Sequence, residues 1–349
     1  MRDVMDTLLA GTSLTRDQAA MVFDRILDGS LEEPVIGAIL ALIQSRRPSV
    51  DELVGAAGAM RRRMTPVPFD LSRVEHHRAG DPPPVVIDTC STGGAPKVFN
   101  VSTCAAIVVA AAAPGRVLVA KHGNRSRTGR GSAEVLAGLG VNIDAEPEIQ
   151  ARCLHEVGVC FCFAIRHHPA ARHAAPARRA LGFPTIFNLL GPLTNPASAS
   201  RQLVGVYDPE LARRVAEALA RLGADRALVV HSADGLDELT ITDRTHLNWV
   251  EGGSVRTELF DPASVGLERC SIEDLRAGGL DEAAALIGRI LDAHPGPPSD
   301  IVCLCAGAAL CVAGAAATIQ DGLAVAREAI GDGSARRTLQ RLAEVSNAT

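Results

Sequence analysis

Two glycine-rich stretches hold most of the residues whose types and spacing could do chemistry. The first places Gly93 and Gly94 a few residues ahead of Asn100, Ser102 and Thr103, where an apolar, helix-like segment begins. Glycine lets the backbone approach a ligand closely, and the first turn of a helix presents unpaired N–H groups with a partial positive charge. A Gly-Gly turn alone most often only reverses the chain, but with this helix start it predicts a phosphate cradle.

The second stretch, residues 121–132, concentrates positive charge in a chain whose net charge is −5. Its basic residues are Lys121, Arg125, Arg127 and Arg130, interleaved with Gly123, Gly129 and Gly131. A solvated charged loop is the ordinary explanation for such a run. No carboxylate occurs before Glu134, however, and the concentration favours a ligand with several negative charges, such as a phosphorylated sugar that carries a diphosphate.

Two adjacent acidic residues, Asp237 and Glu238, follow an apolar run that ends at His231. In a loop, adjacent carboxylates can share a metal ion. Hard oxygen ligands next to a phosphate substrate indicate Mg²⁺. Taken alone, an Asp-Glu pair is more often an exposed surface pair. The prediction of a metal site therefore depends on the phosphate ligand that the two glycine-rich stretches predict.

A segment rich in histidine and arginine, residues 166–179, has two explanations. His167, His168 and His173 could ligate a metal, but the helical histidine spacing of such sites is absent. An arginine in this segment instead suits an acceptor that bears a carboxylate, because the guanidinium fork matches a carboxylate.

The elements that must position these residues change character along the chain. Amphipathic helices are predicted over residues 16–27, 34–44 and 51–63. Ser13 or Thr15 can cap the first of them and Ser49 the third. Together they predict a small N-terminal helical domain over residues 1–70, which a proline-rich linker ends.

From residue 80 onward, apolar strand-like runs alternate with helix-like segments. The runs are residues 85–88, 116–120, 226–231 and 300–306, and the helical segments among them include 103–113 and 132–139. This alternation predicts an α/β fold, in which residues 80–349 form a larger domain with a mostly parallel central sheet. Ligands of such sheets bind beyond the carboxyl ends of the strands, where the glycine-rich stretches lie.

Composition limits the classes of protein that the chain can belong to. Its 349 residues are 47% apolar and only 3% aromatic, which suits an aliphatic core of helices and parallel strands. The net negative charge disfavours a general nucleic-acid or membrane binder. The first residues lack the pattern of a secretory signal, and nine scattered cysteines are expected to be reduced and buried, so a cytoplasmic location is expected.

The order of the motifs points to a family. Lys121-His-Gly-Asn-Arg125, Asn188-Leu-Leu-Gly-Pro-Leu-Thr-Asn-Pro196 and Gly235-Leu-Asp-Glu238 follow one another at characteristic spacing. With them the chain resembles, along nearly its whole length, the anthranilate phosphoribosyltransferase family of the nucleoside phosphorylase and phosphoribosyltransferase superfamily. The resemblance implies phosphoribosyl transfer from phosphoribosyl diphosphate to the amine of anthranilate with release of diphosphate, a step of tryptophan biosynthesis. It also implies Mg²⁺, a homodimer built through the helical domain, and a helical segment near residues 168–190 that joins that domain.

The same resemblance implies roles for individual positions, and it assigns no catalytic acid or base. The implied phosphoribosyl-diphosphate ligands are Ser91, Gly93, Gly94, Asn100, Val101, Ser102, Thr103, Lys121, Arg125, Thr128 and Ser132. The implied acceptor-binding residues are Asn124, His168, Arg178 and Pro192. The implied metal ligands are Ser102, Asp237 and Glu238.

The chain departs from the family pattern at both phosphate loops. Ser91 replaces a glycine, Ala95 replaces an aspartate, and Pro184 replaces an arginine, while each loop is one residue shorter. One interpretation is that Lys97, Arg127 and Arg130 supply charge to the same donor from new places. Another is a paralogue with a different aromatic acceptor, or an enzyme similar to a nucleoside phosphorylase. A nucleic-acid-binding homologue is a third, which the acidic net charge disfavours.

Overall fold

The N-terminal helices begin where the sequence supplies capping side chains. The computed structural model describes residues 1–77, 80, 82–96, 98–126 and 129–348. Its first helices are α1 (Arg2–Leu9), α2 (Arg16–Leu27), α3 (Glu33–Ser45) and α4 (Val50–Arg61). Thr15 forms a capping box with Gln18, and Ser49 forms one with Glu52. The three predicted helices are therefore confirmed to within about two residues at each end.

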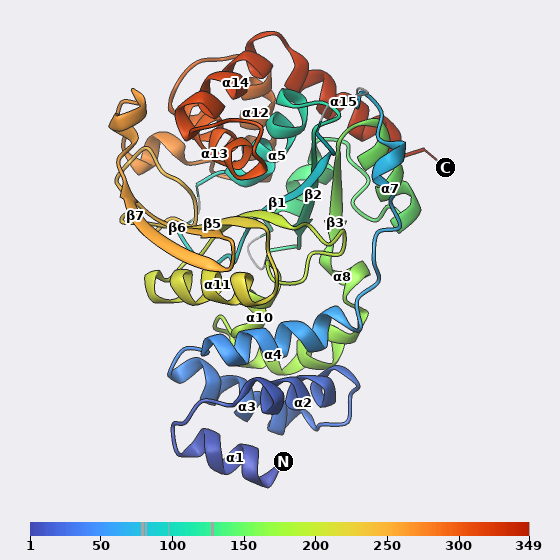
Figure 1. Ribbon diagram of the computed structural model, residues 1–349, viewed down its shortest axis with the longest axis vertical. Coiled ribbons are helices and arrows are strands. Elements are labelled where there is room, and N and C mark those ends of the chain that lie inside the picture. The colour runs from blue at the N-terminus through green and yellow to red at the C-terminus, as the bar shows by residue number, and fades with distance from the viewer. Residues whose placement is uncertain (78–79, 81, 97, 127–128, 349) are drawn as a thin grey trace.

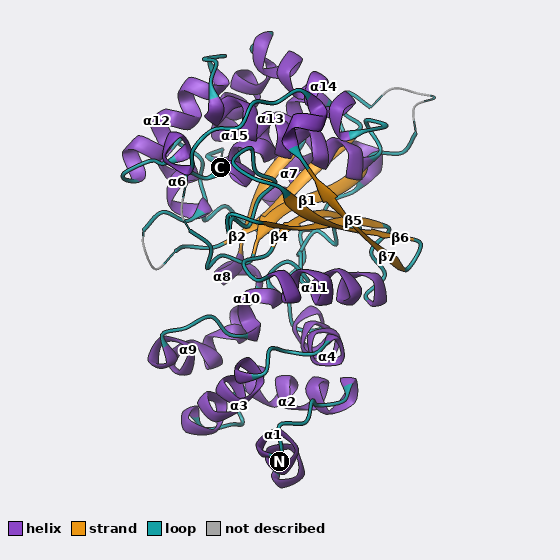
Figure 2. Cartoon of the chain, turned by 90° about the vertical axis from the view of Figure 1, so that its left-hand side faces the viewer, coloured by secondary structure: helices purple, strands orange, loops and turns teal. Residues whose placement is uncertain are grey.

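A second group of short helices packs onto these four from far along the chain. It comprises α8 (Ala164–His167), the 3-10 helix Pro169–Ala174, α9 (Ala175–Leu181) and α10 (Ile186–Leu190). Helix α9 contacts α3, and α10 contacts α4. Figure 2 shows both groups below the sheet, at the end of the molecule that holds the N-terminus. We propose on this basis that residues 168–190 belong with residues 1–70 in one helical domain, and that residues 80–349 supply the other.

The central sheet has seven strands in the order β3-β2-β1-β4-β5-β6-β7. They are β1 (Val85–Ser91), β2 (Val117–Gly123), β3 (Val159–Phe163), β4 (Arg201–Gly205), β5 (Arg226–Ser232), β6 (Thr245–Glu251) and β7 (Ser254–Phe260). The first five are parallel, with Ile87 of β1 paired to Val119 on one side and to Arg201 on the other. Strands β6 and β7 continue the sheet antiparallel. The predicted α/β class with a mostly parallel sheet is confirmed.

Helices cover both faces of the sheet. They are α5 (Val101–Ala112), α6 (Ser132–Gly138), α7 (Pro147–Glu156), α11 (Pro209–Arg221), α12 (Leu280–Leu291), α13 (Pro297–Ala313), α14 (Ile319–Gly331) and α15 (Ser334–Ser346). Figure 1 shows α5 and α13 on one face and α11 on the other, toward the N-terminal helices. Successive strand residues point to opposite faces, so Leu203 joins the core under α13 and Val204 joins the core that α11 shares with the helical domain.

The prediction of a strand over residues 300–306 is wrong. Residues 300–306 lie in α13, which is buried along nearly its whole length. A helix buried on all sides is apolar all round, so a short apolar window of it cannot be told from a buried strand. Cys303 and Cys305 are therefore helical, whereas Cys160 and Cys162 are on strand β3 as predicted. All nine cysteines are unpaired, and eight of them are buried. None of the helices formed by the described residues is long and apolar enough to cross a bilayer.

Candidate functional site

The two glycine-rich loops meet at the carboxyl ends of neighbouring strands. The first leaves β1 at Ser91 and enters α5, for which Asn100 is the N-cap residue. The second leaves β2 at Gly123 and enters α6 at Ser132. The side-chain amide of Asn100 donates to the carbonyl oxygen of Arg130 at 3.2 Å and so joins the two loops.

The backbone of the first loop is shaped by its two glycines. Gly93 and Gly94 are exposed and have φ values of 64° and 101°, a region that side chains rarely adopt. A Cβ on Gly94 would also lie 3.4 Å from the ring of Tyr207. A Cβ on Gly93 would meet no atom within 4 Å, so the loop has open space at this glycine, before the first turn of α5 that holds Val101, Ser102 and Thr103.

Lys121 places a buried positive charge against this helix start. The side chain is only 3% exposed. Its Nζ donates to the carbonyl oxygen of Thr89 and to Oγ of Ser102, the latter at 3.3 Å. Removal from water lowers the pKa of Lys121, and the negative charges of Asp88 and Glu238 oppose that effect. The ammonium group therefore faces the carboxylate pair from across the first turn of α5.

The carboxylate pair lies at the same edge of the sheet, after β5. The backbone N–H of Ser102 donates to Oε1 of Glu238 at 3.2 Å, and Oγ of Ser232 donates to the Glu238 carbonyl at 3.1 Å. Loss of water and then the charge of Asp237 raise the pKa of the Glu238 carboxyl to about 8, against the influence of Lys121 and the Ser102 hydrogen bonds. Two carboxylates held this close, beside a serine hydroxyl, form an oxygen-only donor set that a divalent cation would stabilise.

The donor set fits Mg²⁺ better than a metal enclosed by protein ligands. Among residues 1–77, 80, 82–96, 98–126 and 129–348, no group of three or more His, Cys, Asp or Glu side chains is arranged to hold a metal. Mg²⁺ typically keeps several waters and binds through one or two carboxylates together with substrate phosphates. Asp237, Glu238 and the Ser102 hydroxyl match that requirement.

A buried hydrogen-bond network, which no sequence motif predicted, fixes the ends of β1 and β2. The carboxylate of Asp88, which is fully buried, accepts from the backbone N–H of His122 at 3.0 Å and from the Asn195 side-chain amide at 2.9 Å. Asn195 also donates to the Ala120 carbonyl at 2.8 Å. The only sequence signal for this role was a charged residue inside an otherwise apolar strand. Asp88 and Asn195 thereby hold the two residues that flank Lys121 in β2, Ala120 and His122.

Two neutral histidines lie next to this network. The rings of His122 and His168 are 5.0 Å apart between centroids. Nδ1 of His122 is 3.0 Å from the Gly191 carbonyl oxygen, which can only accept, so Nδ1 carries the proton and Nε2 keeps its lone pair. Both Nε2 atoms are buried and have no hydrogen-bond partner among the described residues. The lone pair on Nε2 of His122 is therefore a buried acceptor without a partner among the described residues.

The histidine pair predicts a loss of stability in acid. Burial, and then the neighbouring His168, lower the pKa of His122 to about 3, with smaller effects from His167 and Lys121. Burial likewise lowers the pKa of His168 to about 4. The unfolded chain therefore binds protons first, and the free energy of unfolding should fall as the pH drops below 6.5, the ordinary histidine value. Urea unfolding between pH 7 and about 4.5 measures this slope.

Substitution separates this effect from general acid sensitivity. His122→Gln keeps a side-chain N–H for the Gly191 carbonyl and removes the titration, so its pH slope should be shallower. His77→Gln, at an exposed position, is the control and should retain the slope of the unmodified protein. An unchanged slope in His122→Gln would show that other groups cause the acid sensitivity.

The predicted acceptor residues lie on the helical side of these loops. The guanidinium of Arg178, on α9, is 5.0 Å from the ring centroid of Phe187. The next residue, Asn188, donates from its side-chain amide to the Thr92 carbonyl at 3.4 Å, directly before Gly93. Pro192 is buried, and its carbonyl accepts from the Gln202 side-chain amide at 2.6 Å. Helix α10 therefore connects the Arg178 region with the first phosphate loop.

The remaining predicted residues lie at the rim or outside the described residues. Asn124 and Arg125 are exposed, and the Arg125 guanidinium lies 5.7 Å from the ring centroid of Phe163. Ser132 occupies the first turn of α6. Thr128, and with it Lys97 and Arg127, fall outside the described residues, so their predicted roles stay predictions.

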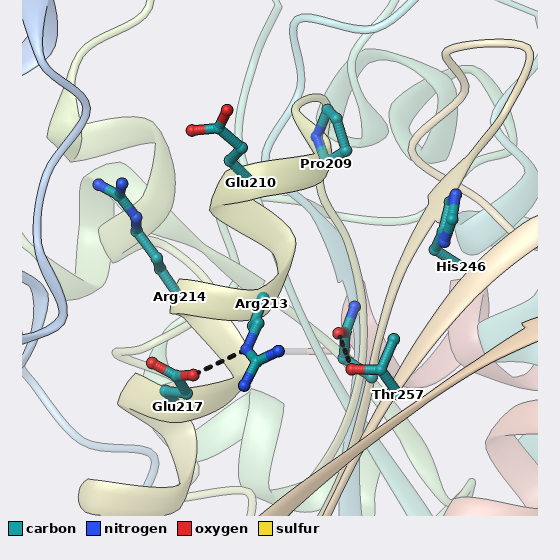
Figure 3. Close-up of a pocket in the computed structure, with 8 residues that line it drawn as sticks. Pro209, Glu210, Arg213, Arg214, Glu217, His246 and Thr257 are labelled. Carbon is teal, nitrogen blue, oxygen red and sulfur yellow. Dashed lines mark hydrogen bonds and ion pairs between the residues drawn. The ribbon is translucent and has the colours of Figure 1, made fainter.

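A cavity of about 540 Å³ lies elsewhere, between the first turns of α11 and strands β6 and β7. Figure 3 shows Arg213 directed at Glu217 on the same helix, a pair 3.0 Å apart. Arg214 donates to the Arg47 and Pro48 carbonyls of the helical domain. The arginines that line this cavity are balanced by Glu210 and Glu217, so it offers no excess positive charge to a diphosphate.

Two family models cover most of the chain. One, described as the helical bundle domain of a glycosyl transferase family, matches residues 2–64. The other, described as the a/b domain of a glycosyl transferase family, matches residues 83–336.

Individual relatives agree with the family models. An anthranilate phosphoribosyltransferase from Methylorubrum extorquens is 46% identical over 341 residues, which is 97% of this chain and 96% of the relative. One from Moorella thermoacetica is 45% identical over 337 residues, or 96% of this chain and 95% of the relative. The crystal structure of anthranilate phosphoribosyltransferase from Thermus thermophilus is 38% identical and superimposes with a TM-score of 0.89, covering 99% of this chain and all of that one. The chain belongs to the anthranilate phosphoribosyltransferase family of glycosyl transferases.

Proposed function

We propose that the chain transfers the phosphoribosyl group of phosphoribosyl diphosphate to the amine of anthranilate and releases diphosphate, a step of tryptophan biosynthesis. The observation that carries the proposal is the convergence of Lys121, the first turn of α5 and the Asp237-Glu238 pair at one edge of the sheet. The relatives and the solved structure that place the chain in its family are named for the same reaction.

The chain's own residues match the charge that develops on the leaving group. Breaking the bond at the anomeric carbon leaves negative charge on the diphosphate and oxocarbenium character on the ribose. The Lys121 ammonium and the partial positive charge at the N-terminus of α5 are fixed in place to stabilise that negative charge. Mg²⁺, held by Asp237, Glu238 and the Ser102 hydroxyl, would neutralise further phosphate charge. Such pre-positioned groups lower the barrier because they need no rearrangement as the bond breaks.

The acceptor side requires orientation more than base catalysis. The amine becomes acidic only as its bond to the sugar forms, so a strong base is not needed beforehand. Nε2 of His122 keeps its lone pair and has no partner among the described residues, so it can accept from an N–H donor that displaces the side chains covering it. The planar guanidinium group of Arg178 can form two parallel hydrogen bonds to a carboxylate. An aromatic amine with a carboxylate, as in anthranilate, combines both features in one ligand.

Arg178 is expected to separate acceptor binding from donor binding. Arg178→Met keeps an apolar stem against Phe187 but removes the charged fork. Loss of a charge-assisted pair should raise the KM for anthranilate at least about tenfold while the KM for phosphoribosyl diphosphate changes little. Steady-state kinetics with each substrate varied in turn measures both constants. Arg179→Met, at the exposed neighbouring position, is the matched control, and an equal loss for both substrates in Arg178→Met would refute the assignment.

A screen of acceptors tests the reaction itself. Purified protein is supplied with phosphoribosyl diphosphate, Mg²⁺ and one of several aromatic amines, and diphosphate release is followed. Anthranilate should give the fastest release, and an amine without the carboxylate should give little. Release of ribose 1-phosphate from a nucleoside with inorganic phosphate, in place of transfer, would indicate the phosphorylase alternative. The family and the acidic net charge support the transferase over that alternative and over a nucleic-acid-binding homologue.

We further propose a cytoplasmic homodimer. Nine unpaired cysteines suit a reducing compartment. On the helical domain, Leu9 of α1 and Met21 of α2 are 68% and 45% exposed, and a second copy of the chain would cover such apolar side chains. Light scattering of the purified protein measures its mass in solution.

A further inference from the structure

Arg130 joins three segments of the candidate site. It stands in the second loop, between β2 and α6. Its Nη1 donates to the carbonyl oxygen of Ala277, and its own carbonyl accepts from the Asn100 side-chain amide at 3.2 Å. Asn100 in turn is the N-cap residue of α5, at the predicted phosphate cradle. Arg130 therefore links the second loop to the first loop and to the segment before α12.

The base of the second loop is closed without Arg130. The carboxylate of Glu134 accepts from the Gly131 N–H at 2.9 Å and from the Ser126 N–H at 3.3 Å. A Cβ on Gly131 would lie 2.6 Å from the Asn124 carbonyl oxygen, so the two ends of the loop are in close contact. These contacts fix the ends of the loop, whereas Arg130 provides its connection to neighbouring segments.

The partner of the Arg130 guanidinium is itself held in place. Ala277 is 3% exposed, and the N–H of Gly278 donates to the Glu282 carboxylate at 2.6 Å in the first turn of α12. The preceding residue, Arg276, is different, because its side chain is exposed and pairs on the surface with Glu273 at 3.2 Å. The buried carbonyl of Ala277 therefore holds the Arg130 guanidinium, and the exposed Arg276 provides a control position for mutagenesis.

We propose that Arg130 is a positioning residue that straps the second loop to Ala277 and thereby orients Asn100 for the diphosphate of the donor. The identity of the ligand in this proposal rests on the proposed function, whereas the strap itself does not. The guanidinium is engaged by a backbone carbonyl, so this arginine acts through Asn100 rather than by touching a phosphate.

Arg130→Gln tests the strap in two measurements. In the unliganded protein, amide hydrogen exchange at Gly129 should accelerate about tenfold, the equivalent of one hydrogen bond to a charged group. The amide of Gly131, which donates to Glu134, should change less and serves as an internal reference. In steady-state kinetics the KM for phosphoribosyl diphosphate should rise about tenfold, while kcat and the KM for anthranilate stay within about threefold.

Two further variants distinguish the positioning role of Arg130 from a general loss of surface charge. Arg130→Lys keeps a charged donor for the Ala277 carbonyl and should recover most of the lost affinity, and Arg276→Gln should behave like the unmodified protein. Weaker donor binding with unchanged exchange in Arg130→Gln would mean a direct phosphate contact and would overturn the proposal. Faster exchange with unchanged donor binding would overturn the positioning role. If the chain transferred no phosphoribosyl group at all, the exchange result would still decide whether the strap exists.

Discussion

Asp237→Asn and Glu238→Gln are each expected to reduce Mg²⁺-dependent binding of phosphoribosyl diphosphate about 100-fold or more, with a similar loss of kcat/KM. Both substitutions keep the shape of the side chain and remove one negative oxygen. A cation held by two carboxylates and a substrate diphosphate loses a main ligand in either variant. Titration calorimetry with and without Mg²⁺ measures the loss directly.

The expected effect on stability distinguishes a ligand role from a structural one. Burial and the neighbouring Asp237 raise the pKa of Glu238 to about 8, which means that its charged form is unfavourable in the unliganded protein. Glu238→Gln should therefore leave the melting temperature of that protein unchanged or higher. Asp243→Asn, at a partly exposed acid with a surface ion pair to Arg269, is the control and should bind normally. A fall in melting temperature that accounts for the lost binding would contradict the metal-ligand assignment.

Gly205→Ala is expected to weaken Mg²⁺-dependent donor binding at the same site, because it disturbs the backbone of Asp237. Gly205 ends β4, and a Cβ there would lie 1.6 Å from the carbonyl oxygen of Asp237. Because that contact is with backbone, the segment that carries both carboxylates must move. Loss of Mg²⁺-dependent donor binding should approach that of Asp237→Asn, and overpacking should cost about 1–3 kcal/mol of unfolding free energy.

A glycine in open space provides the matched control. Gly331, at the end of α14, has no atom within 4 Å of the position that a Cβ would take, so Gly331→Ala should keep donor binding and stability. Urea unfolding can be followed by the fluorescence of Trp249, the one tryptophan in the chain. Folded Gly205→Ala protein that binds the donor as tightly as the unmodified protein would show that Asp237 does not need its present position.

Local features of the fold were predictable because they depend on neighbouring residues. The capping boxes at Thr15 and Ser49 follow from side chains three residues apart. The places of the two glycine-rich loops follow from glycines and polar residues between a strand and a helix. The strand predicted over residues 300–306 failed, because a helix in the centre of a packed layer has no polar face to reveal its period.

The contacts that assemble the site could not be predicted in the same way. Ser102 and Glu238 are 136 residues apart, and Asp88 and Asn195 are 107 apart. Both contacts depend on the order of strands, which places β1 between β2 and β4. Patterns of polarity within one strand do not specify its neighbours. The resemblance to a family supplied the prediction that Asp237 and Glu238 bind a metal, but only the folded chain brings Asp88 and His122 beside Lys121.

The most direct test of a Mg²⁺-dependent phosphoribosyl-diphosphate site is calorimetry on the unmodified protein. Phosphoribosyl diphosphate is titrated into the protein with Mg²⁺ and again with excess chelator, and ribose 1-phosphate and inorganic phosphate are titrated for comparison. Saturable binding of phosphoribosyl diphosphate that weakens at least about tenfold without Mg²⁺ is the expected result. No binding of phosphoribosyl diphosphate in the presence of Mg²⁺, together with binding of ribose 1-phosphate or phosphate, would contradict the site proposed at Ser102, Lys121, Asp237 and Glu238.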